Sequence, residues 1–232
     1  MTGILYGAGV GPGDPELMTL KAVRLIKENE IIALPGPAAK ETVAYQIAVQ
    51  AVPELAGKTL LSVDMPMTHD REEMHRNHEK AADAIEVYLK QAQNVVFLTL
   101  GDPTIYSTYL YVQKRILARG YQAELISGIT SFCAAAARSR TPLVEWDEQL
   151  HILPAVHKLN SDLSLPGNYV LMKSGRKMHQ VKEILKSSGR DVVMVENCGM
   201  ENEHIYRSAE EIPDDAGYYS LIIAKEPGGR HD

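Results

Sequence analysis

Short apolar segments alternate with longer amphipathic segments along most of the chain. Five apolar segments in about the first 130 residues have the length and composition of buried strands, at 4–8, 30–34, 59–63, 94–100 and 121–126. Segments with helical periodicity accompany them, at 20–28, 41–51, 71–91, 108–119 and 132–137. Because strands that alternate with helices form βαβ units, this part is predicted to be an α/β domain with a mainly parallel sheet.

This rhythm breaks at residues 141–148, where Thr-Pro-Leu-Val-Glu-Trp-Asp-Glu follows an alanine-rich segment. Beyond it we expect one helix at 177–187 and strands at 151–154, 168–172, 191–196, 204–207 and 219–224. Short connections join the last three strands, which predicts antiparallel pairs in a mixed sheet. We therefore expect two α/β domains, residues 1–143 and 149–232, with Trp146 packed at the boundary.

Composition and charge narrow the class of protein. The 232 residues are 45% hydrophobic and carry a formal net charge of −6, which argues against a broad nucleic-acid-binding surface. Cys133 and Cys198 lie outside any CxxC motif, so neither a disulfide framework nor a zinc site is indicated. No apolar stretch reaches membrane-spanning length, and no basic leader follows Met1. We expect an unprocessed, soluble protein of the cytoplasm.

The segment 98–107, Leu-Thr-Leu-Gly-Asp-Pro-Thr-Ile-Tyr-Ser, ends an apolar strand with a polar turn. Ligands of open α/β sheets bind at the carboxyl ends of such strands. Gly101 would let a ligand approach the backbone, and Asp102 could accept hydrogen bonds from an ammonium group or from ribose hydroxyls. The alternative is an ordinary strand-to-helix turn with Thr104 as the N-cap. Taken alone, the turn favours this alternative.

The glycine-rich segment 7–16 raises the possibility of a dinucleotide-binding loop after the first strand. Its spacing does not match, because Pro12 and Asp14 stand where the pattern needs glycine or alanine. The carboxylate of Asp14 would also repel a pyrophosphate. The sequence therefore disfavours NAD(P) binding.

Three motifs occur in the order and spacing of the tetrapyrrole methyltransferases: Gly-Val-Gly-Pro-Gly-Asp-Pro-Glu-Leu at 9–17, Gly-Asp-Pro-Thr-Ile-Tyr-Ser at 101–107 and Gly-Ile-Thr-Ser at 128–131. Four further segments, at 97–103, 131–138, 170–176 and 218–223, resemble the branch that methylates C-20 of precorrin-2 or cobalt-factor II in cobalamin biosynthesis. The chain is similar to this family over its whole length.

The resemblance implies a homodimer of two-domain subunits, with S-adenosylmethionine in the cleft between the domains. It implies that the cofactor is contacted by the Gly-Asp-Pro loop, by the Gly-Ile-Thr-Ser turn and by two segments of the second domain. The residues so assigned are Leu100, Gly101, Asp102, Thr104, Ile105, Tyr106, Ser107, Thr130, Ser131, Phe132, Met172, Tyr219, Ser220 and Leu221. The resemblance also implies that the loop with Gly13 and Asp14 faces the tetrapyrrole.

The expected reaction is transfer of the sulfonium methyl group to a nucleophilic meso carbon, followed by loss of a proton. Since the macrocycle is a polycarboxylate, an acidic protein must gather basic residues around it. Our candidates are Arg138, Lys173 and Arg176. A solvated basic surface is the alternative for Lys177, and it is favoured for Lys182, Lys186 and Arg190, which recur along one helix. No catalytic residue is assigned, because Asp14, Glu145 and His157 cannot be ranked as a general base.

His69, His75 and His78 lie in one segment, but we predict no metal site there. His78 shares a helical stripe with Met74 and Ile85, where a packed histidine is the usual outcome. The alternative is that this segment caps the macrocycle. Two rival functions remain: a methyltransferase of the same fold that acts on a protein or ribosomal RNA, and a non-catalytic nucleotide-binding module.

Overall fold

The computed structural model describes residues 2–66, 68, 70–155 and 163–228. The chain divides into two compact units, Met1–Thr130 and Ser131–Asp232, which we call the N-terminal and C-terminal units. The division lies before helix α5 (Ser131–Ser139), because α5 contacts strands of the C-terminal unit. The sequence analysis places the boundary later, at 143–149, and those domain limits stay a prediction.

The N-terminal unit contains a five-stranded sheet in the order β3-β2-β4-β1-β5. Its strands are β1 (Ile4–Gly9), β2 (Ile31–Pro35), β3 (Thr59–Val63), β4 (Val95–Thr99) and β5 (Gln122–Ile126). Every pairing between them is parallel, so the prediction of a mainly parallel sheet is confirmed. The carboxyl ends of β1, β4 and β5 therefore meet at one edge of the sheet.

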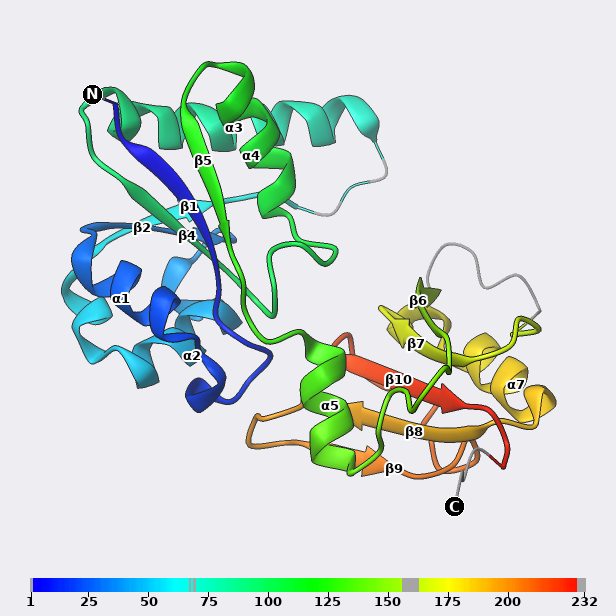
Figure 1. The fold of residues 1–232 in the computed structure, drawn as a ribbon. Coiled ribbons are helices and arrows are strands. Elements are labelled where there is room, and N and C mark those ends of the chain that lie inside the picture. Colours follow the sequence, from blue (N-terminus) through cyan, green and yellow to red (C-terminus); the bar gives the residue numbers. More distant parts are fainter. Residues whose placement is uncertain (1, 67, 69, 156–162, 229–232) are drawn as a thin grey trace. The chain divides into compact units, whose positions relative to one another are not determined.

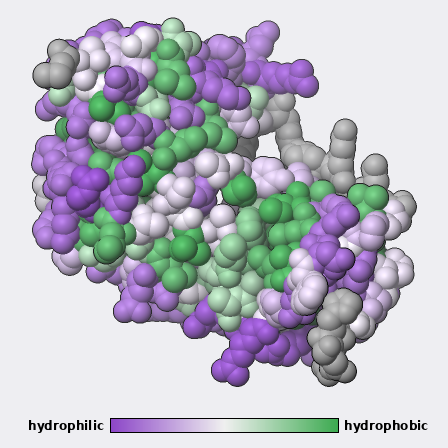
Figure 2. All heavy atoms as spheres, in the orientation of Figure 1, coloured by the Kyte–Doolittle hydropathy of each residue, from purple (hydrophilic) through white to green (hydrophobic). Residues whose placement is uncertain are grey.

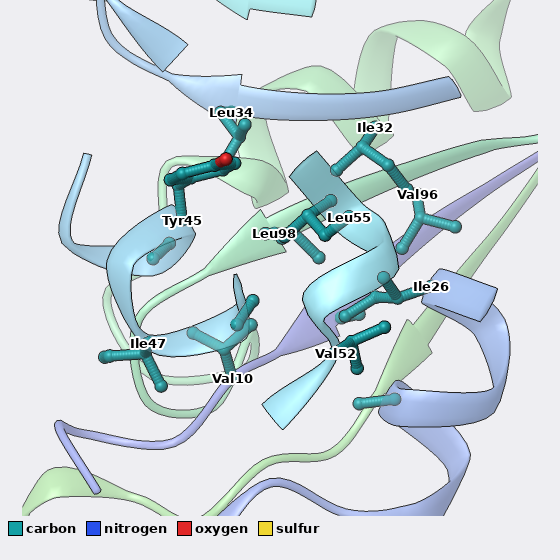
Figure 3. Packing of buried hydrophobic residues seen from close by; sticks show 14 of the residues in the cluster. Val10, Ile26, Ile32, Leu34, Tyr45, Ile47, Val52, Leu55, Val96 and Leu98 are labelled. Atoms are coloured by element: carbon teal, nitrogen blue, oxygen red, sulfur yellow. The ribbon is translucent and has the colours of Figure 1, made fainter. Parts of the chain in front are cut away.

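Helices cover both faces of this sheet (Figure 1). They are α1 (Leu20–Glu28), α2 (Val43–Ala51), α3 (Arg71–Lys90) and α4 (Tyr109–Ala118), with short 3-10 turns at Pro15–Leu17, Ala39–Glu41 and Pro53–Gly57. Val96 and Leu98 of β4 enter the core beside α1 and α2 (Figure 3), whereas Val95 and Phe97 enter the core beside α3 and α4. Because β4 is buried on both faces, its sequence shows no polar alternation.

Side-chain caps start several of these helices. Thr19 accepts a hydrogen bond from the Ala22 amide at the start of α1, and Asp70 accepts two at the start of α3. Asp14 caps the 3-10 turn Pro15–Leu17 in the same way. Each side chain satisfies an amide that the first helical turn leaves unpaired.

The C-terminal unit contains a mixed five-stranded sheet in the order β6-β7-β10-β8-β9. Its strands are β6 (Leu150–Pro154), β7 (Asn168–Met172), β8 (Asp191–Glu196), β9 (His204–Tyr206) and β10 (Ser220–Lys225). Only the β6–β7 pairing among these described strands is parallel, which confirms the predicted antiparallel pairs. Helix α7 (Met178–Ser188), preceded by the turn Gly175–Lys177, packs on the sheet and ends at Gly189.

The prediction that Trp146 packs at a domain boundary is wrong. Its side chain is 97% exposed, and its backbone is left-handed, with φ of 50°. The Glu145 amide donates to the carboxylate of Glu148 at 2.8 Å, and this closed turn leaves the indole in solvent. Glu148 holds the turn to the sheet, because its carboxylate also accepts hydrogen bonds from Asn168 of β7 and from Lys225 of β10.

Hydrophobic residues also reach the surface of the C-terminal unit. Figure 2 shows them gathered where Figure 1 draws β6 and β7. All five residues of the edge strand β6 are half-buried. Within the described part of the chain, no helix is both long and apolar enough to cross a membrane.

Arg190 organises the segment that leads into β7. Its guanidinium donates to the carbonyl oxygens of Leu163, Leu165 and Gly167, with distances from 2.6 to 3.3 Å. It also lies 4.6 Å from the centre of the Tyr169 ring, whose hydroxyl donates to Leu165. A planar guanidinium can satisfy several carbonyls at once while it stacks on an aromatic ring.

We expect Arg190→Lys to lower the free energy of unfolding by about 2 kcal/mol, because an ammonium group cannot reach all three carbonyls. Urea denaturation measures the loss. Arg24→Lys is the control, since Arg24 forms an exposed pair with Glu28 and its replacement should change stability by less than about 0.5 kcal/mol. Equal stability of the two variants would contradict this account of Arg190.

Candidate cofactor and substrate site

Three glycines bring three backbone segments into contact at the carboxyl edge of the N-terminal sheet. Gly9 ends β1, Gly101 follows β4 and Gly128 follows β5. A Cβ on Gly9 would lie 2.8 Å from the Cα of Gly128 and closer still to the carbonyl oxygen of Gly101. A Cβ on Gly128 would likewise lie 2.9 Å from the Cα of Gly9. The amide of Gly101 also donates to the carbonyl oxygen of Gly11 at 2.8 Å.

Asp102 spans two of these segments. One carboxylate oxygen, Oδ1, accepts from the Thr104 amide at 2.7 Å and from the Thr104 hydroxyl. The other, Oδ2, accepts from the Gly128 amide at 3.0 Å. The side chain is 7% exposed. The carboxylate thus accepts hydrogen bonds from the protein itself, whereas the sequence alone predicts that a ligand supplies the donors.

The alternative in which Thr104 is the N-cap of the following helix is wrong. Helix α4 begins at Tyr109 with Thr108 at its N-cap position, so Thr104 is not the N-cap. The buried hydroxyls of Ser107, in the loop before α4, and Thr99, at the end of β4, are hydrogen-bonded to each other at 2.9 Å. Ser107 also accepts from the Tyr109 amide. Ser107, a predicted cofactor contact, therefore anchors the loop to the end of β4.

Tyr109 fixes the far end of this loop. Its ring lies against Gly7, where any Cβ would collide with it, and 5.6 Å from the Phe97 ring centre. Its hydroxyl donates to the carbonyl of Glu124 on β5 at 2.7 Å. Burial raises the pKa of this hydroxyl well above its usual value, so it stays protonated as a donor.

The remaining predicted cofactor residues of this loop are at least partly exposed to solvent. Leu100 and Ile105 are half-buried and Thr104 is exposed. Tyr106 is 42% exposed and has a left-handed backbone, with φ of 49°. This conformation is costly for a residue with a Cβ and is found preferentially at functional sites.

The Gly-Ile-Thr-Ser turn reaches the same edge through Gly128. The hydroxyl of Thr130 is buried and, among the described residues, has no hydrogen-bond partner. Ser131 then opens α5, and Phe132 is buried. An unpaired buried hydroxyl costs free energy that a polar ligand could recover.

In the C-terminal unit, the predicted cofactor residues beyond α5 lie at neighbouring strand ends: Met172 ends β7, Ser220 and Leu221 begin β10, and Tyr219 directly precedes it. Met172 and Leu221 are directly paired in the antiparallel ladder. The Ser220 hydroxyl donates to the carbonyl of Gly217 at 2.8 Å. Tyr219 packs edge-on against Tyr218, with ring centres 5.2 Å apart, and burial raises the pKa of both hydroxyls.

Two residues that the sequence analysis did not single out shape this part. Ser174 is fully buried, and its hydroxyl has no hydrogen-bond partner among the described residues. Glu196 accepts from the Gly217 amide at 2.6 Å and from the Tyr206 hydroxyl, so it holds the turn before β10. Ser174 lies within the motif 170–176, but no local pattern links Glu196 to a turn 21 residues away.

The predicted substrate residues are in different situations. Arg138 forms a bidentate pair with Glu203, with its shortest contact at 2.7 Å, and this pairing lowers the pKa of Glu203. Lys173 has a left-handed backbone, and partial burial lowers the pKa of its ammonium. Gly13 is buried in the first loop beside Asp14. The side chain of Arg176 lies outside what the structure describes.

His78 is packed, as the sequence analysis expects. Its ring stacks on Tyr111 at 4.5 Å, with 7° between the planes, whereas His75 is exposed. His69 and His157 lie outside the described residues. The described residues contain no cluster of three or more His, Cys, Asp or Glu that could hold a metal ion.

Comparison with known families decides the classification. The family model of tetrapyrrole (corrin/porphyrin) methylases matches residues 4–213. The chain belongs to this family. The resemblance drawn from the sequence motifs is thereby confirmed.

Curated relatives match over nearly the whole chain. A probable cobalt-precorrin-2 C(20)-methyltransferase of Methanocaldococcus jannaschii is 34% identical over 95% of this chain and 95% of its own. A precorrin-2 C(20)-methyltransferase of Sinorhizobium is 30% identical over 95% and 94%. The cobalt-precorrin-2 C(20)-methyltransferase of Salmonella typhimurium is 27% identical over 97% and 98%.

Solved structures share the fold. A cobalt precorrin-4 methyltransferase is 22% identical, covers 96% of this chain and 94% of its own, and superposes with a TM-score of 0.72. A uroporphyrin-III C-methyltransferase of Thermus thermophilus, complexed with S-adenosylhomocysteine, is 24% identical over 97% and 98%, with a TM-score of 0.69. The predicted two-part α/β fold of a tetrapyrrole methylase is thus confirmed.

The glycine contact can be tested by adding one methyl group. We expect Gly9→Ala to lower the free energy of unfolding by about 1–3 kcal/mol, because the new Cβ would overlap two backbone segments. Gly57→Ala is the control, since a Cβ at that position would meet no other part of the chain within 4 Å; its stability should change by less than about 0.5 kcal/mol. Similar thermal unfolding of both variants would refute the contact.

Stability should fall on acidification because of His78, which is 6% exposed. Burial, and secondarily the charge of Arg115, lower the pKa of His78 in the folded state. Its contribution is therefore complete above the unfolded-state pKa and is lost as the pH falls through the folded-state pKa. We expect His78→Phe, which keeps a ring on Tyr111, to reduce the drop in unfolding free energy between about pH 7.5 and 5. The control His204→Gln, at an exposed position on β9, should keep the wild-type drop.

Proposed function

We propose that this protein transfers a methyl group from S-adenosylmethionine to C-20 of precorrin-2 or cobalt-factor II in cobalamin biosynthesis. The observation that carries the proposal is the 34% identity, over 95% of both chains, to a relative named for methylation at C-20 of cobalt-precorrin-2. Two more relatives with the same C(20) designation also match nearly end to end. A cobalt-precorrin-4 C(11)-methyltransferase of Methanocaldococcus jannaschii and a uroporphyrinogen-III C-methyltransferase of Methanobacterium ivanovii match at 26% identity.

For the cofactor, we propose two sets of contact residues, each within one unit. The set of the N-terminal unit is the exposed part of the loop after β4 with the unpaired hydroxyl of Thr130. The set of the C-terminal unit is the paired residues Met172 and Leu221 with the neighbouring Tyr219. Hydroxyls and backbone groups suit the polar ends of S-adenosylmethionine, and the apolar side chains suit its adenine ring.

The bound sulfonium supplies an activated methyl group to the nucleophilic meso carbon. The protein's task is then chiefly to position the reactants and to exclude water. The loop from Gly101 to Ser107 suits that task, because Asp102, Ser107 and Tyr109 hold it at both ends. No side chain is assigned as the base that receives the meso proton.

For the substrate, we propose that Lys173 and Arg176 bind carboxylates of the macrocycle and that Gly13 and Asp14 line its binding surface. Arg138 would have to exchange its pairing with Glu203 to take part, which makes it the least available of the three basic candidates. A homodimer in the cytoplasm, with domains 1–143 and 149–232, completes the proposal.

The test is a methylation assay with two acceptors. The protein is incubated with S-adenosylmethionine carrying a ¹³C-methyl group and with either metal-free precorrin-2 or cobalt-factor II. We expect one acceptor to gain one methyl group by mass, located at C-20 by NMR, and added S-adenosylhomocysteine to inhibit the transfer. Absence of transfer to both acceptors, or a label on another carbon, would overturn the proposal.

A further inference from the structure

We propose that Asp102 is a positioning residue, which holds the loop after β4 against the loop after β5 and makes no direct contact with the cofactor. The inference rests on the proposed function, since it concerns the site for S-adenosylmethionine. It replaces the expectation that this carboxylate binds an ammonium group or ribose hydroxyls.

Most of the acceptor capacity of the Asp102 carboxylate is already used by the protein. Both oxygens already accept hydrogen bonds from the protein, two on Oδ1 and one on Oδ2, and the side chain is almost fully buried. A carboxylate that accepts amide hydrogen bonds is strongly held in its orientation. A cofactor ammonium would have to displace a donor of Thr104 or Gly128, or reach the one acceptor position left on Oδ2 of a side chain that is 7% exposed.

The two residues that donate to Asp102 lie where the proposed cofactor contacts begin. Thr104 begins the exposed part of the loop after β4, and Gly128 begins the Gly-Ile-Thr-Ser turn. These are the two segments of the N-terminal unit in which the cofactor contacts are proposed. One carboxylate therefore sets the spacing between them, across 26 residues of sequence.

Asp102 also stabilises the backbone contact among the three glycine segments. The glycines at positions 9, 101 and 128 allow the segments to touch but offer no side chain to hold them in register. The hydrogen bond from the Gly128 amide to Asp102 supplies that hold. Loss of the bond would let the two loops drift, and an ångström of misplacement is enough to weaken ligand binding and catalysis strongly.

The consequence is a specific pattern of affinities. In Asp102→Asn, the amide oxygen can still serve Thr104, but the amide NH₂ faces the Gly128 N–H, donor to donor. Because the damage lies in the loops, the variant should bind S-adenosylhomocysteine about tenfold more weakly or worse. It should lose the same factor for analogues that lack the α-ammonium group, the 2′-hydroxyl or the 3′-hydroxyl.

The experiment measures the dissociation constants of S-adenosylhomocysteine and these three analogues by calorimetry, for the wild type and four variants. Thr104→Val removes one donor to the carboxylate and should show a smaller, equally uniform loss. Thr104→Ser keeps the hydroxyl and should restore near wild-type affinity. Asp70→Asn is the matched control, because Asp70 also accepts two backbone amides but caps α3; its affinities should equal those of the wild type.

A loss in Asp102→Asn that shrinks for one analogue would identify the missing group as a direct partner and overturn the inference. Unchanged affinities in Asp102→Asn would overturn it as well. If Asp102→Asn does not fold, the Thr104 pair decides: a uniform loss in the Val variant with rescue in the Ser variant supports the inference, and any other pattern refutes it. Failure of the wild type to bind S-adenosylhomocysteine would instead refute the proposed function.

Discussion

The close approach of three glycine backbones is the constraint on which the N-terminal unit depends. At this point the chain leaves β1, β4 and β5 through segments that touch without any side chain between them. Gly9 and Gly128 must lack a Cβ for this contact, and Gly101 has a φ of 71°, which favours glycine. It places the loops after three strands within hydrogen-bonding reach of one another, and Asp102 and Gly11 then provide the acceptors that hold them.

The two hydrophobic cores of the N-terminal unit, one on each face of its sheet, hold the strands that lead to this contact. Successive residues of β4 enter opposite cores, so the strand that carries the Gly-Asp-Pro turn is buried on both faces. Tyr109 holds the other end of the loop, because its ring packs against Gly7 of β1 and its hydroxyl donates to a carbonyl of β5. The loop is thus rigid at both ends and open in its middle, which suits a site that works by holding reactants in place.

In the C-terminal unit, paired strands position the proposed cofactor residues. Its sheet is mixed, and two of the proposed cofactor residues, Met172 and Leu221, lie on directly paired strands, with Tyr219 in the turn before β10. The loop after β7 carries Lys173 in a left-handed conformation and the buried hydroxyl of Ser174, and Tyr106 has the same backbone strain in the other unit. Strained residues beside orphaned polar groups are what a structure retains where a ligand is to be bound.

The sequence by itself determined the elements and the fold class. Strands such as 59–63 and 168–172 and the helix at 20–28 agree with the structure residue for residue, and most other ends differ by one or two positions. These features depend on periodicity, caps and glycine stops, which are properties of neighbours in the chain. The motifs also sufficed to indicate the family.

Only the tertiary structure decided what the site residues do. Asp102 accepts a hydrogen bond from Gly128, Arg138 pairs with Glu203 over 65 residues of sequence, and Glu148, not Trp146, binds its segment to the sheet. A local pattern shows that a carboxylate or a guanidinium is present but not which distant donor or acceptor reaches it first. Partners of that kind are set by the packing of whole strands and helices, because a hydrogen bond forms only when folding brings both atoms within about 3 Å.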